Sequence, residues 1–372
     1  MQPARFTALD VFRGMTVCFM IIVNTPGSYE TAYTPLLHAP WHGFTPTDLV
    51  FPSFMFAVGN AMSFVTKKWS MMTNGAVLSK IFKRTIIIFL LGYFMYWFPF
   101  VHWNDSGGLS GNPIANTRIM GVLQRIALGY CVAALMIHYL KLNTALRISV
   151  AFLFIYWLIL LLFRGSADPY DMTTNAGTRL DLWLFGPNHL YHGEGVAFDP
   201  EGLLSTLPAI ANVTFGYAAG KWIQEKGNSY EGLTKLLLMG VTLIFLALCW
   251  NNFHPINKKL WTGSYVFLTV GIDCILLAAL VYLIDFLKIK RFNYFFEVFG
   301  RNPLFIYLVS ELAVILLWFI PIGDTPLYQW LFQNIFSKAG MYFGSFLFAI
   351  TFMLSCWSVG YLLDKGKIYV RV

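Results

Sequence analysis

The sequence predicts an all-α polytopic membrane protein built as one domain over residues 1–372. Apolar residues make up 57% of the chain and charged residues 12%, whereas ordinary soluble domains carry about 25% charged residues. The apolar residues lie in long runs and not at every second position, which excludes a membrane β-barrel. These observations also exclude a cytosolic enzyme, a disordered binder and a disulfide-stapled secreted domain.

A transmembrane helix needs about 20 mostly apolar residues. Arg13 precedes the first apolar run as in a signal peptide, but no small-residue cleavage site follows, so we expect a retained helix. We find no internal repeat and no appended soluble domain. About ten membrane-spanning helices are predicted, at 8–25, 47–66, 84–101, 119–140, 146–163, 203–222, 234–251, 262–286, 299–320 and 341–363.

The positions of the Lys and Arg residues predict the orientation, because cytoplasmic loops are enriched in them. With the N-terminus in the cytoplasm, most of the 26 basic residues, Arg5 and Arg371 among them, fall on cytoplasmic segments. Ten helices then place both termini there. The net charge of +8 is thereby a topology signal, and we expect no nucleic-acid partner. Two long outer loops remain, at 25–46 and 164–202, and long loops tend to be functional.

The first outer loop contains two histidines and a predicted helix start. Thr45 can be the N-cap, with Pro46 at the first helical position and Asp48 at the third, as in a capping box. His38 and His42 therefore lie just before the outer end of the second helix. A histidine suits a general base because its pKa lies near neutrality. The alternative is that both histidines bond to backbone and that Asp48 is a simple cap.

No metal site is expected. His38 and His42 have helical spacing, but Pro40 and Gly43 break any helix between them, and no HExxH carboxylate is present. The five cysteines lie inside apolar runs without metal or disulfide spacing, and we interpret them as small core residues. They are Cys18, Cys131, Cys249, Cys274 and Cys356.

Charges inside predicted spans form a second signal, because they are energetically unfavourable there and usually functional. Arg125, Asp273, Arg301 and Glu311 occupy such positions. They either form structural ion pairs between helices, for example Arg125 with Asp273, or mark a substrate path. A helix start at Asn302 would also direct free backbone N–H groups at an anion.

Polar groups at the two membrane surfaces each allow two interpretations. Lys83 and Arg84, at the cytoplasmic end of the third span, could bind lipid phosphate or the phosphates of a nucleotide-like donor, or simply extend to the membrane surface. The outer segment 255–265 contains Asn257, Lys258 and aromatic residues. It suits sugar binding, although Trp and Tyr also form interfacial belts.

Five motifs, together with Asn24, give the chain a resemblance to a known family. They are Leu9-Asp-Val-Phe-Arg13-Gly14, the segment from His38 to Pro52, Arg118-Ile-Met-Gly-Val-Leu-Gln-Arg125, Phe198-Asp-Pro-Glu-Gly202-Leu-Leu and Pro255-Ile-Asn-Lys-Lys-Leu-Trp261. They occur in one order over nearly the whole chain. The chain resembles the heparan-alpha-glucosaminide N-acetyltransferase family of transmembrane acyltransferases, including bacterial members linked to N-acetylglucosamine use.

The resemblance implies a multi-pass enzyme that takes acetyl groups from cytosolic acetyl-CoA and acetylates an amino sugar across the membrane. It implies His38 as the catalytic histidine, paired with Asn24, and Asp48 as the associated aspartate. His42 is an additional histidine, so the resemblance leaves open which one acts. It also implies a homodimer, and the chain suits a bacterial inner membrane.

On this basis we assign candidate binding residues. Those for acetyl-CoA are Lys83, Arg84, Arg125, Arg147, Lys221 and Arg301. Those for the glucosamine-like acceptor are Trp41, His42, Asp199, Glu201, Asn257 and Lys258. His38 serves as general base or, alternatively, forms an acetyl-histidine. The competing functions are an inner-membrane transporter of amino sugars, which the absence of repeats disfavours, and acetylation of an envelope glycan.

Overall fold

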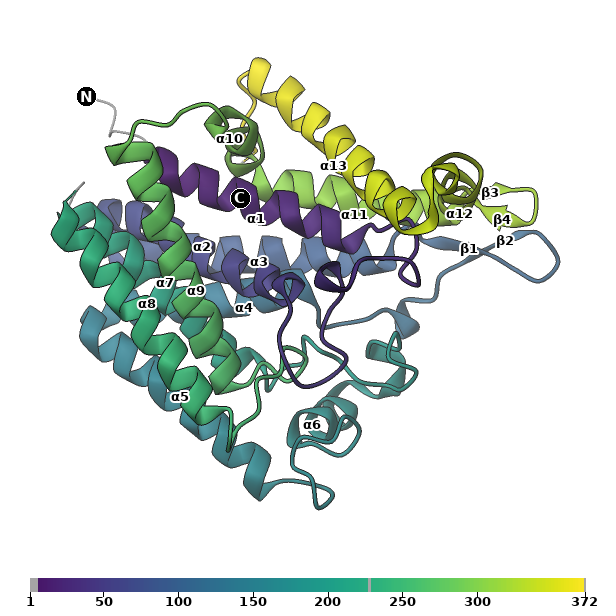
Figure 1. The fold of residues 1–372 in the computed structure, drawn as a ribbon. Coiled ribbons are helices and arrows are strands. Elements are labelled where there is room, and N and C mark those ends of the chain that lie inside the picture. The colour runs from purple at the N-terminus through teal and green to yellow at the C-terminus, as the bar shows by residue number, and fades with distance from the viewer. Residues whose placement is uncertain (1–5, 227–228, 371–372) are drawn as a thin grey trace.

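The computed structural model describes residues 6–226 and 229–370, so that Arg5 and Arg371, two of the charges used for orientation, lie outside the described residues. This part of the chain is helical, with two short antiparallel hairpins, β1–β2 (Val101–Trp103 and Leu109–Gly111) and β3–β4 (Pro321–Ile322 and Thr325–Pro326) (Figure 1). The helices are α1 Thr7–Asn24, α2 Val50–Val65, α3 Asn74–Trp97, α4 Val122–Tyr139, α5 Leu142–Leu162, α6 Ala176–Phe185, α7 Thr206–Lys226, α8 Tyr230–Trp250, α9 Gly263–Val281, α10 Asn293–Arg301, α11 Pro303–Phe319, α12 Leu327–Leu331 and α13 Met341–Lys365.

The predicted span 299–320 falls on two helices, α10 and α11, and each of the other nine predicted spans falls on one helix. Within the described residues, seven helices are long and apolar enough to cross a membrane, or eight when the bent pair α10–α11 counts as one span. Helices α3 and α7 fall outside this set. Lys83 and Arg84 reduce the hydropathy of α3. Helix α7 packs against α2, α4, α5 and α9, so its polar Asn212 and Thr214 are fully buried in protein and need not face lipid.

The ninth predicted span, 299–320, is not one continuous helix. The chain bends by 81° between α10 and α11. Pro303 causes the break, because proline lacks the N–H that a continuous helix needs and disfavours helical backbone at the residue before it. Buried Asn302 stabilises the bend: its amide donates to Ile368 O at 2.9 Å and its carbonyl accepts from Val370 N at 2.8 Å.

Helix α10 connects the two ends of the described chain. A Cβ on Gly14 of α1 would lie 1.8 Å from Phe296 O, and one on Gly300 would lie 2.0 Å from Asp10 O. Only glycine at these positions permits so close a helix crossing. Because Asp364 near the end of α13 pairs with Arg301 of α10, the start of α1 and the end of α13 lie on the same side of the bundle.

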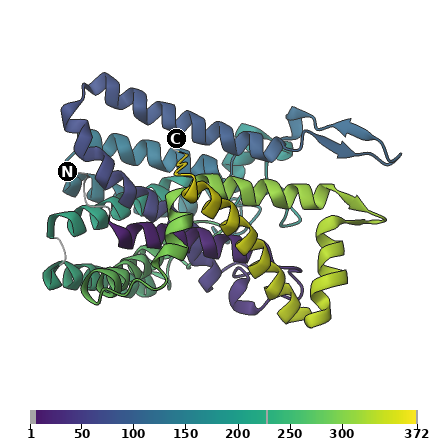
Figure 2. The same ribbon diagram turned by 90° about the horizontal axis from the view of Figure 1, so that it is seen from above.

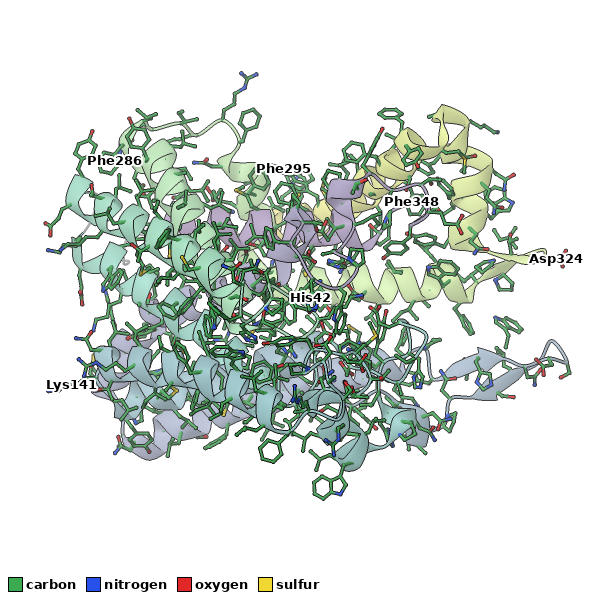
Figure 3. The ribbon with its side chains drawn as sticks, turned by 60° about the horizontal axis from the view of Figure 1, so that its bottom comes forward. His42, Lys141, Phe286, Phe295, Asp324 and Phe348 are labelled. Atoms are coloured by element: carbon green, nitrogen blue, oxygen red, sulfur yellow. The ribbon has the colours of Figure 1, made fainter. Side chains whose placement is uncertain are left out.

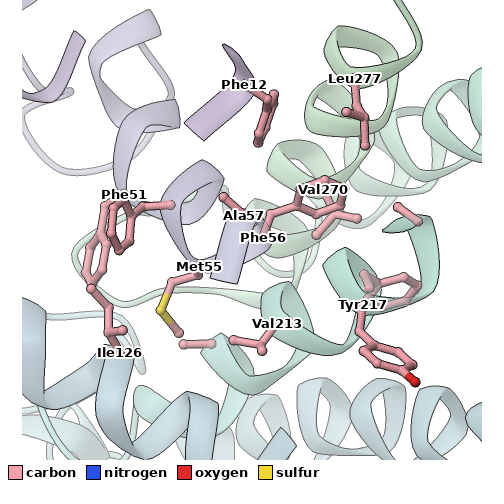
Figure 4. Close-up of a cluster of buried hydrophobic side chains, with 14 of the residues drawn as sticks. Phe12, Phe51, Met55, Phe56, Ala57, Ile126, Val213, Tyr217, Val270 and Leu277 are labelled. Atoms are coloured by element: carbon pink, nitrogen blue, oxygen red, sulfur yellow. The ribbon is translucent and has the colours of Figure 1, made fainter. Parts of the chain in front are cut away.

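A buried core packs the helices against one another. Phe51, Met55 and Phe56 of α2 pack towards α4, α7 and α9, where Ile126 and Val213 are among the partners (Figure 4). Phe56 and Met55 are fully buried. Such close packing gives the loops at the helix ends a fixed frame.

The side of the bundle predicted to be outer carries more structure than two loops. Both hairpins project at one end of the bundle (Figure 2), and Trp103 Nε1 of β1 donates to Phe319 O of α11 at 2.9 Å. The predicted loop at 164–202 contains helix α6, and the loop at 25–46 contains only a short 3₁₀ turn at Thr34–Leu36. The β1–β2 segment between α3 and α4 is a third structured connection on this side, and hydropathy alone did not predict its hairpin.

Candidate active site

The first outer loop ends in the predicted capping box. A 3₁₀ turn at Pro46–Leu49 leads into α2, with Thr45 as its N-cap. Asp48 Oδ2 accepts from Thr45 N at 2.9 Å and from Ala39 N at 3.1 Å. Tyr265 of α9 donates to Asp48 O at 2.7 Å. The cap is thereby confirmed, and it fixes the Asp48 carboxylate against the backbone on either side of the histidine loop.

The other oxygen of Asp48 reaches His38. His38 Nδ1 lies 2.7 Å from Asp48 Oδ1, with the aspartate side chain 1% exposed and the histidine 40% exposed. An ionised carboxylate only accepts hydrogen bonds, so Nδ1 carries the proton and Nε2 keeps its lone pair. Burial lowers the pKa of His38, and the charge of Lys258 lowers it further against the opposing effect of Asp48. His38 is therefore a neutral imidazole of defined tautomer, with its lone pair on Nε2.

His42 lies in a different environment. Its Nδ1 lies 3.3 Å from Asn257 Nδ2, and its ring packs near Trp41 and Tyr170. Figure 3 labels this histidine among the loop side chains. Burial lowers its pKa, but no carboxylate pairs with it among the described residues. The geometry separates the two histidines that the sequence left equivalent, because only His38 pairs with Asp48.

A cavity of about 170 Å³ opens beside His38; we call it the outer cavity, because it lies on the side predicted to be outer, and we call the one lined by Arg13 and Arg84 the inner cavity. Its polar lining consists of Asn24, His38, Thr47, Glu201, Lys258 and Tyr307, and its apolar lining of Met20, Val23, Val50, Phe51 and Val122. These residues come from α1, α2, α4 and α11 and from the loops before α2, α7 and α9. Asn24 also hydrogen-bonds Glu311 of α11.

Arg118 organises the acidic residues near this cavity. Its Nε and Nη2 donate to both oxygens of Asp199, at 2.9 and 2.6 Å, and Nη2 also donates to Glu201 at 2.6 Å. The guanidinium lies between the rings of Tyr96 and Tyr191, 4.8 Å from each centroid. Such bidentate, stacked pairing is specific to arginine.

The two carboxylates differ in what they can reach. Asp199 has a fully buried side chain behind Arg118 and is not among the residues that line the cavity, so its role in binding the acceptor stays a prediction. Burial raises the pKa of Asp199. Glu201 lines the cavity. Burial opposes its ionisation, but the charges of Arg118, Arg125 and Lys258 outweigh burial and lower its pKa.

The predicted acceptor segment 255–265 supports the site in two ways. Asn257 is fully buried; its Oδ1 accepts from Leu260 N at 2.8 Å, so it holds the loop and does not line the cavity. Lys258 lines the cavity, with Nζ 2.9 Å from His38 Nε2 and 3.0 Å from His38 Nδ1. Trp41, like His42, packs in the loops beside the cavity and is not part of its lining.

A second cavity, of about 70 Å³, lies towards the other side of the bundle. Arg13 of α1 and Arg84 of α3 supply its charge, and the guanidinium of Arg84 lies 4.7 Å from the ring centroid of Tyr130. Its remaining lining comes from α2, α3, α4 and the first residues of α11: Phe54, Ala57, Val58, Ala61, Ile88, Ile126, Pro303 and Leu304.

Of the six residues predicted to bind acetyl-CoA, only Arg84 lines this inner cavity. Lys83 and Arg147 are exposed outside it, and Lys221 lies 3.7 Å from Glu225. Arg301 is paired with Glu297 and Asp364.

Arg125 corrects another expectation. It is fully buried, donates to Ser205 and to Gly202 O, and lies over the ring of Trp261. Asp273 instead accepts from Ser53. The predicted Arg125–Asp273 ion pair is therefore wrong, because the loop before α7 supplies the partners of Arg125.

The two cavities lie in line between the same four helices. On α2, Phe51 faces the outer cavity and Phe54 the inner one; α4, α1 and α11 likewise contribute residues to both. Arg13 and Asn24 are eleven residues apart on α1, which corresponds to about 16 Å of helix rise. An extended phosphopantetheine chain can bridge such a distance.

Sequence reasoning missed several residues of the site. Arg13 and Arg118 belong to two of the five motifs, but their charges were interpreted only as topology signals. Thr47 and Tyr307 line the outer cavity without a sequence signal of their own. Within the described residues, no cluster of three or more His, Cys, Asp and Glu side chains has a metal-binding arrangement.

Comparison with known proteins relates the chain to two enzymes. It is 28% identical to human heparan-alpha-glucosaminide N-acetyltransferase over 83% of this chain and 53% of the human protein. It is 29% identical to the mouse enzyme over 82% of this chain and 53% of the mouse protein. The chain thus spans about half the length of these relatives, and it matches no protein-family model. These similarities over most of the chain support its membership of the heparan-alpha-glucosaminide N-acetyltransferase family, as the motifs predict.

Proposed function

We propose that this protein is a transmembrane acetyltransferase, which moves an acetyl group from cytosolic acetyl-CoA to the amine of a glucosamine-like sugar on the outer side. The observation that carries the proposal is the alignment of the two cavities. His38, paired with the buried Asp48, lies at the outer cavity, arginines lie at the inner one, and four helices connect them. The names of the two relatives support the reaction class.

The donor enters at the inner cavity. Arg13 and Arg84 bind its phosphates, and the first turn of α11, which starts at Pro303 beside them, adds backbone N–H groups and the positive end of a helix dipole. The pantetheine arm extends between α1, α2, α4 and α11. Its thioester then reaches the outer cavity.

His38 accepts and donates the protons of the transfer. An amino sugar arrives largely as the ammonium form, so Nε2 first takes one proton and releases it to outer water. The free amine attacks the thioester carbon, the C–N bond forms, and His38 takes a second proton from the nitrogen. The C–S bond then breaks, and the leaving thiolate receives that proton. The products are the acetamide, CoA thiol and one released proton.

Other cavity residues position the reactants. Asp48 holds the Nδ1–H tautomer of His38. Asn24 lines the cavity beside His38 and orients the histidine or donates to the developing oxyanion. Glu201 presents negative charge to the incoming ammonium. The Lys and Arg distribution supports an orientation in which this cavity faces outwards, which is the periplasmic side of the proposed bacterial inner membrane.

The test is acetyl transfer by the purified, detergent-solubilised protein. Labelled acetyl-CoA and glucosamine are mixed with it, and N-acetylglucosamine is read by mass spectrometry. We expect product from the wild type and from His42→Ala, and none from His38→Ala. Absence of product with a panel of amino sugars, together with no binding of acetyl-CoA, would reject the enzyme in favour of the transporter. Labelled acetyl on His38 without acceptor would replace direct transfer by an acetyl-histidine route.

A further inference from the structure

Lys258 occupies an unusual position relative to the base. Its Nζ is almost equally distant from the two ring nitrogens of His38, at 2.9 and 3.0 Å. The N–H of one nitrogen and the lone pair of the other diverge in the ring plane. An atom this close to both therefore lies over the ring face and along neither direction. Lys258 thus leaves the Nε2 lone pair free for the acceptor.

The ammonium of Lys258 also lacks a direct counter-ion. Among the described residues no carboxylate forms an ion pair with it, and Asp48 and Glu201 act on it only through space. The neighbouring Lys259 is different, since it donates to Glu194 at 2.7 Å and to Pro40 O at 3.0 Å. Lys258 therefore has N–H donors available to a ligand in the cavity, whereas the donors of Lys259 are engaged.

These contacts define what Lys258 can do in an acyl transfer. A cation over the imidazole face disfavours protonation of His38 at a distance where Coulomb interactions are strong. The free N–H groups lie in the same cavity as Nε2, where the thioester carbonyl must stand beside the attacking amine. A preorganised donor that stabilises the oxyanion makes one of the greatest contributions to the rate of such reactions.

We propose that Lys258 is a catalytic residue: it donates a hydrogen bond to the thioester carbonyl oxygen as negative charge develops there, and its charge keeps His38 unprotonated. This inference rests on the proposed acetyl transfer. It replaces the simpler role of binding an acceptor hydroxyl. In the step, the amine forms the C–N bond, the C=O electrons move to oxygen beside the Lys258 ammonium, and they return as the C–S bond breaks.

The charged groups around the pair are few. His38 faces Asp48, Lys258 and Glu201, and burial is the largest influence on its pKa. Lys258 faces the same two carboxylates, with Lys259 and Arg125 as further positive charges. Removing the Lys258 charge leaves His38 with Asp48 and Glu201 as its nearest charges, both of which favour the protonated ring.

The experiment compares Lys258→Met, Lys258→Arg and Lys259→Gln in the full chain, with acetyl-CoA and glucosamine as substrates. For Lys258→Met we expect kcat to fall about 100-fold, the loss typical of one oxyanion donor. The acid limb of the kcat/KM profile should rise by about one pH unit, as expected when a neighbouring charge is lost. Lys258→Arg should keep the acid limb, and Lys259→Gln should keep both values.

A second measurement does not depend on turnover. Diethylpyrocarbonate modifies neutral imidazole, and peptide mass spectrometry resolves His38 from the other histidines. The midpoint of modification against pH should rise in Lys258→Met and stay unchanged in Lys259→Gln.

Each of these results either supports or refutes the proposed role of Lys258. A raised KM for glucosamine with unchanged kcat, acid limb and modification midpoint would assign Lys258 to acceptor binding and overturn the inference. A wild type without transfer would refute the proposed function. In that case an unmoved midpoint would also refute the effect of Lys258 on His38.

Discussion

Replacing Asp48 by asparagine changes the tautomer of His38 but keeps the hydrogen bonds that hold its loop. Asp48 Oδ2 accepts backbone N–H groups from Ala39 and Thr45, and an amide NH₂ cannot occupy that position. The asparagine carbonyl oxygen must therefore replace Oδ2, which places its NH₂ group against Nδ1 of His38. Nδ1 must then accept a hydrogen bond, and the ring proton moves to Nε2, where it blocks the base.

The size of the effect follows from the bonds that change. To return to the active tautomer, the variant must lose three interactions. The new bond from the asparagine NH₂ group to Nδ1 breaks, the Nδ1–H then points at that NH₂ group, and the charge-assisted bond to the carboxylate is no longer available. At roughly 1–3 kcal/mol for each of these losses, the penalty is about 4 kcal/mol. Since each 1.36 kcal/mol changes a rate tenfold, kcat should fall about 1,000-fold. The KM for acetyl-CoA should change little, because the inner cavity is untouched.

The assay is the same transfer of labelled acetyl to glucosamine, with thermal unfolding in detergent measured in parallel. Thr45→Val is the matched control, since it removes the hydroxyl bonds to Leu37 O and Asp48 but leaves the His38–Asp48 pair. We expect kcat in this control within about fivefold of wild type, the scale of about 1 kcal/mol for one net hydrogen bond. A kcat for Asp48→Asn within tenfold of wild type would refute the reasoning.

Four further outcomes are expected. Because burial and a neighbouring ammonium lower the pKa of His38 from 6.5, kcat/KM should decline only below that pH; a midpoint at or above 7 would contradict this. Arg118→Met leaves the buried Asp199 carboxylate unpaired and should destabilise the protein by about 3–5 kcal/mol; an unchanged unfolding temperature would refute this ion pair as a stabilising one. Gly202→Ala places a Cβ 2.0 Å from Asp181 Oδ2 and should reduce stability by about 1–3 kcal/mol, unlike an alanine at Gly75 of α3, where no atom lies within 4 Å of the added Cβ. Burial raises the pKa of Asp181 from 3.8 to about 7, so the folded state binds a proton that the unfolded state has lost; stability should fall as pH rises from about 4 to 7, and Asp181→Asn should remove that slope.

Local features of the site could be predicted from the sequence. Thr45, Pro46 and Asp48 stand at fixed capping positions, and His38 lies within ten residues of the aspartate. Short-range geometry of this kind depends on backbone rules that the sequence states directly. Nine of the ten predicted spans likewise coincide with one helix each, because burial in lipid requires long apolar runs; the number that cross the membrane stays a prediction.

Long-range partners could not be predicted in this way. Lys258 reaches His38 across 220 residues of sequence, and Arg118 reaches Asp199 across 81. Hydropathy gives the ends of helices but not which loops meet above them. Arg125 illustrates the limit: its burial was expected, but its partner Ser205 comes from a loop and not from another span.

Pro303 was a sequence signal for the break at Asn302, because proline disfavours a continuous helix. The apolar residues on either side of it nevertheless led to the prediction of one span. The consequence for the site is considerable, because the break starts α11 beside Arg13 and Arg84 at the inner cavity. A continuous helix would have no free N–H groups at this point.

The charges of the outer cavity give an incoming amine a direction. In the proposed reaction, Glu201, kept ionised by Arg118 and Arg125, would attract the ammonium of the acceptor, while Lys258 would attract the carbonyl oxygen of the donor. Both attractions are stronger in a partly buried cavity than in water. His38 belongs to the same lining. On the proposed mechanism the cavity would therefore align a cationic acceptor with a polar thioester before either reacts, and we expect an amine to be preferred over a neutral hydroxyl as the acetyl acceptor.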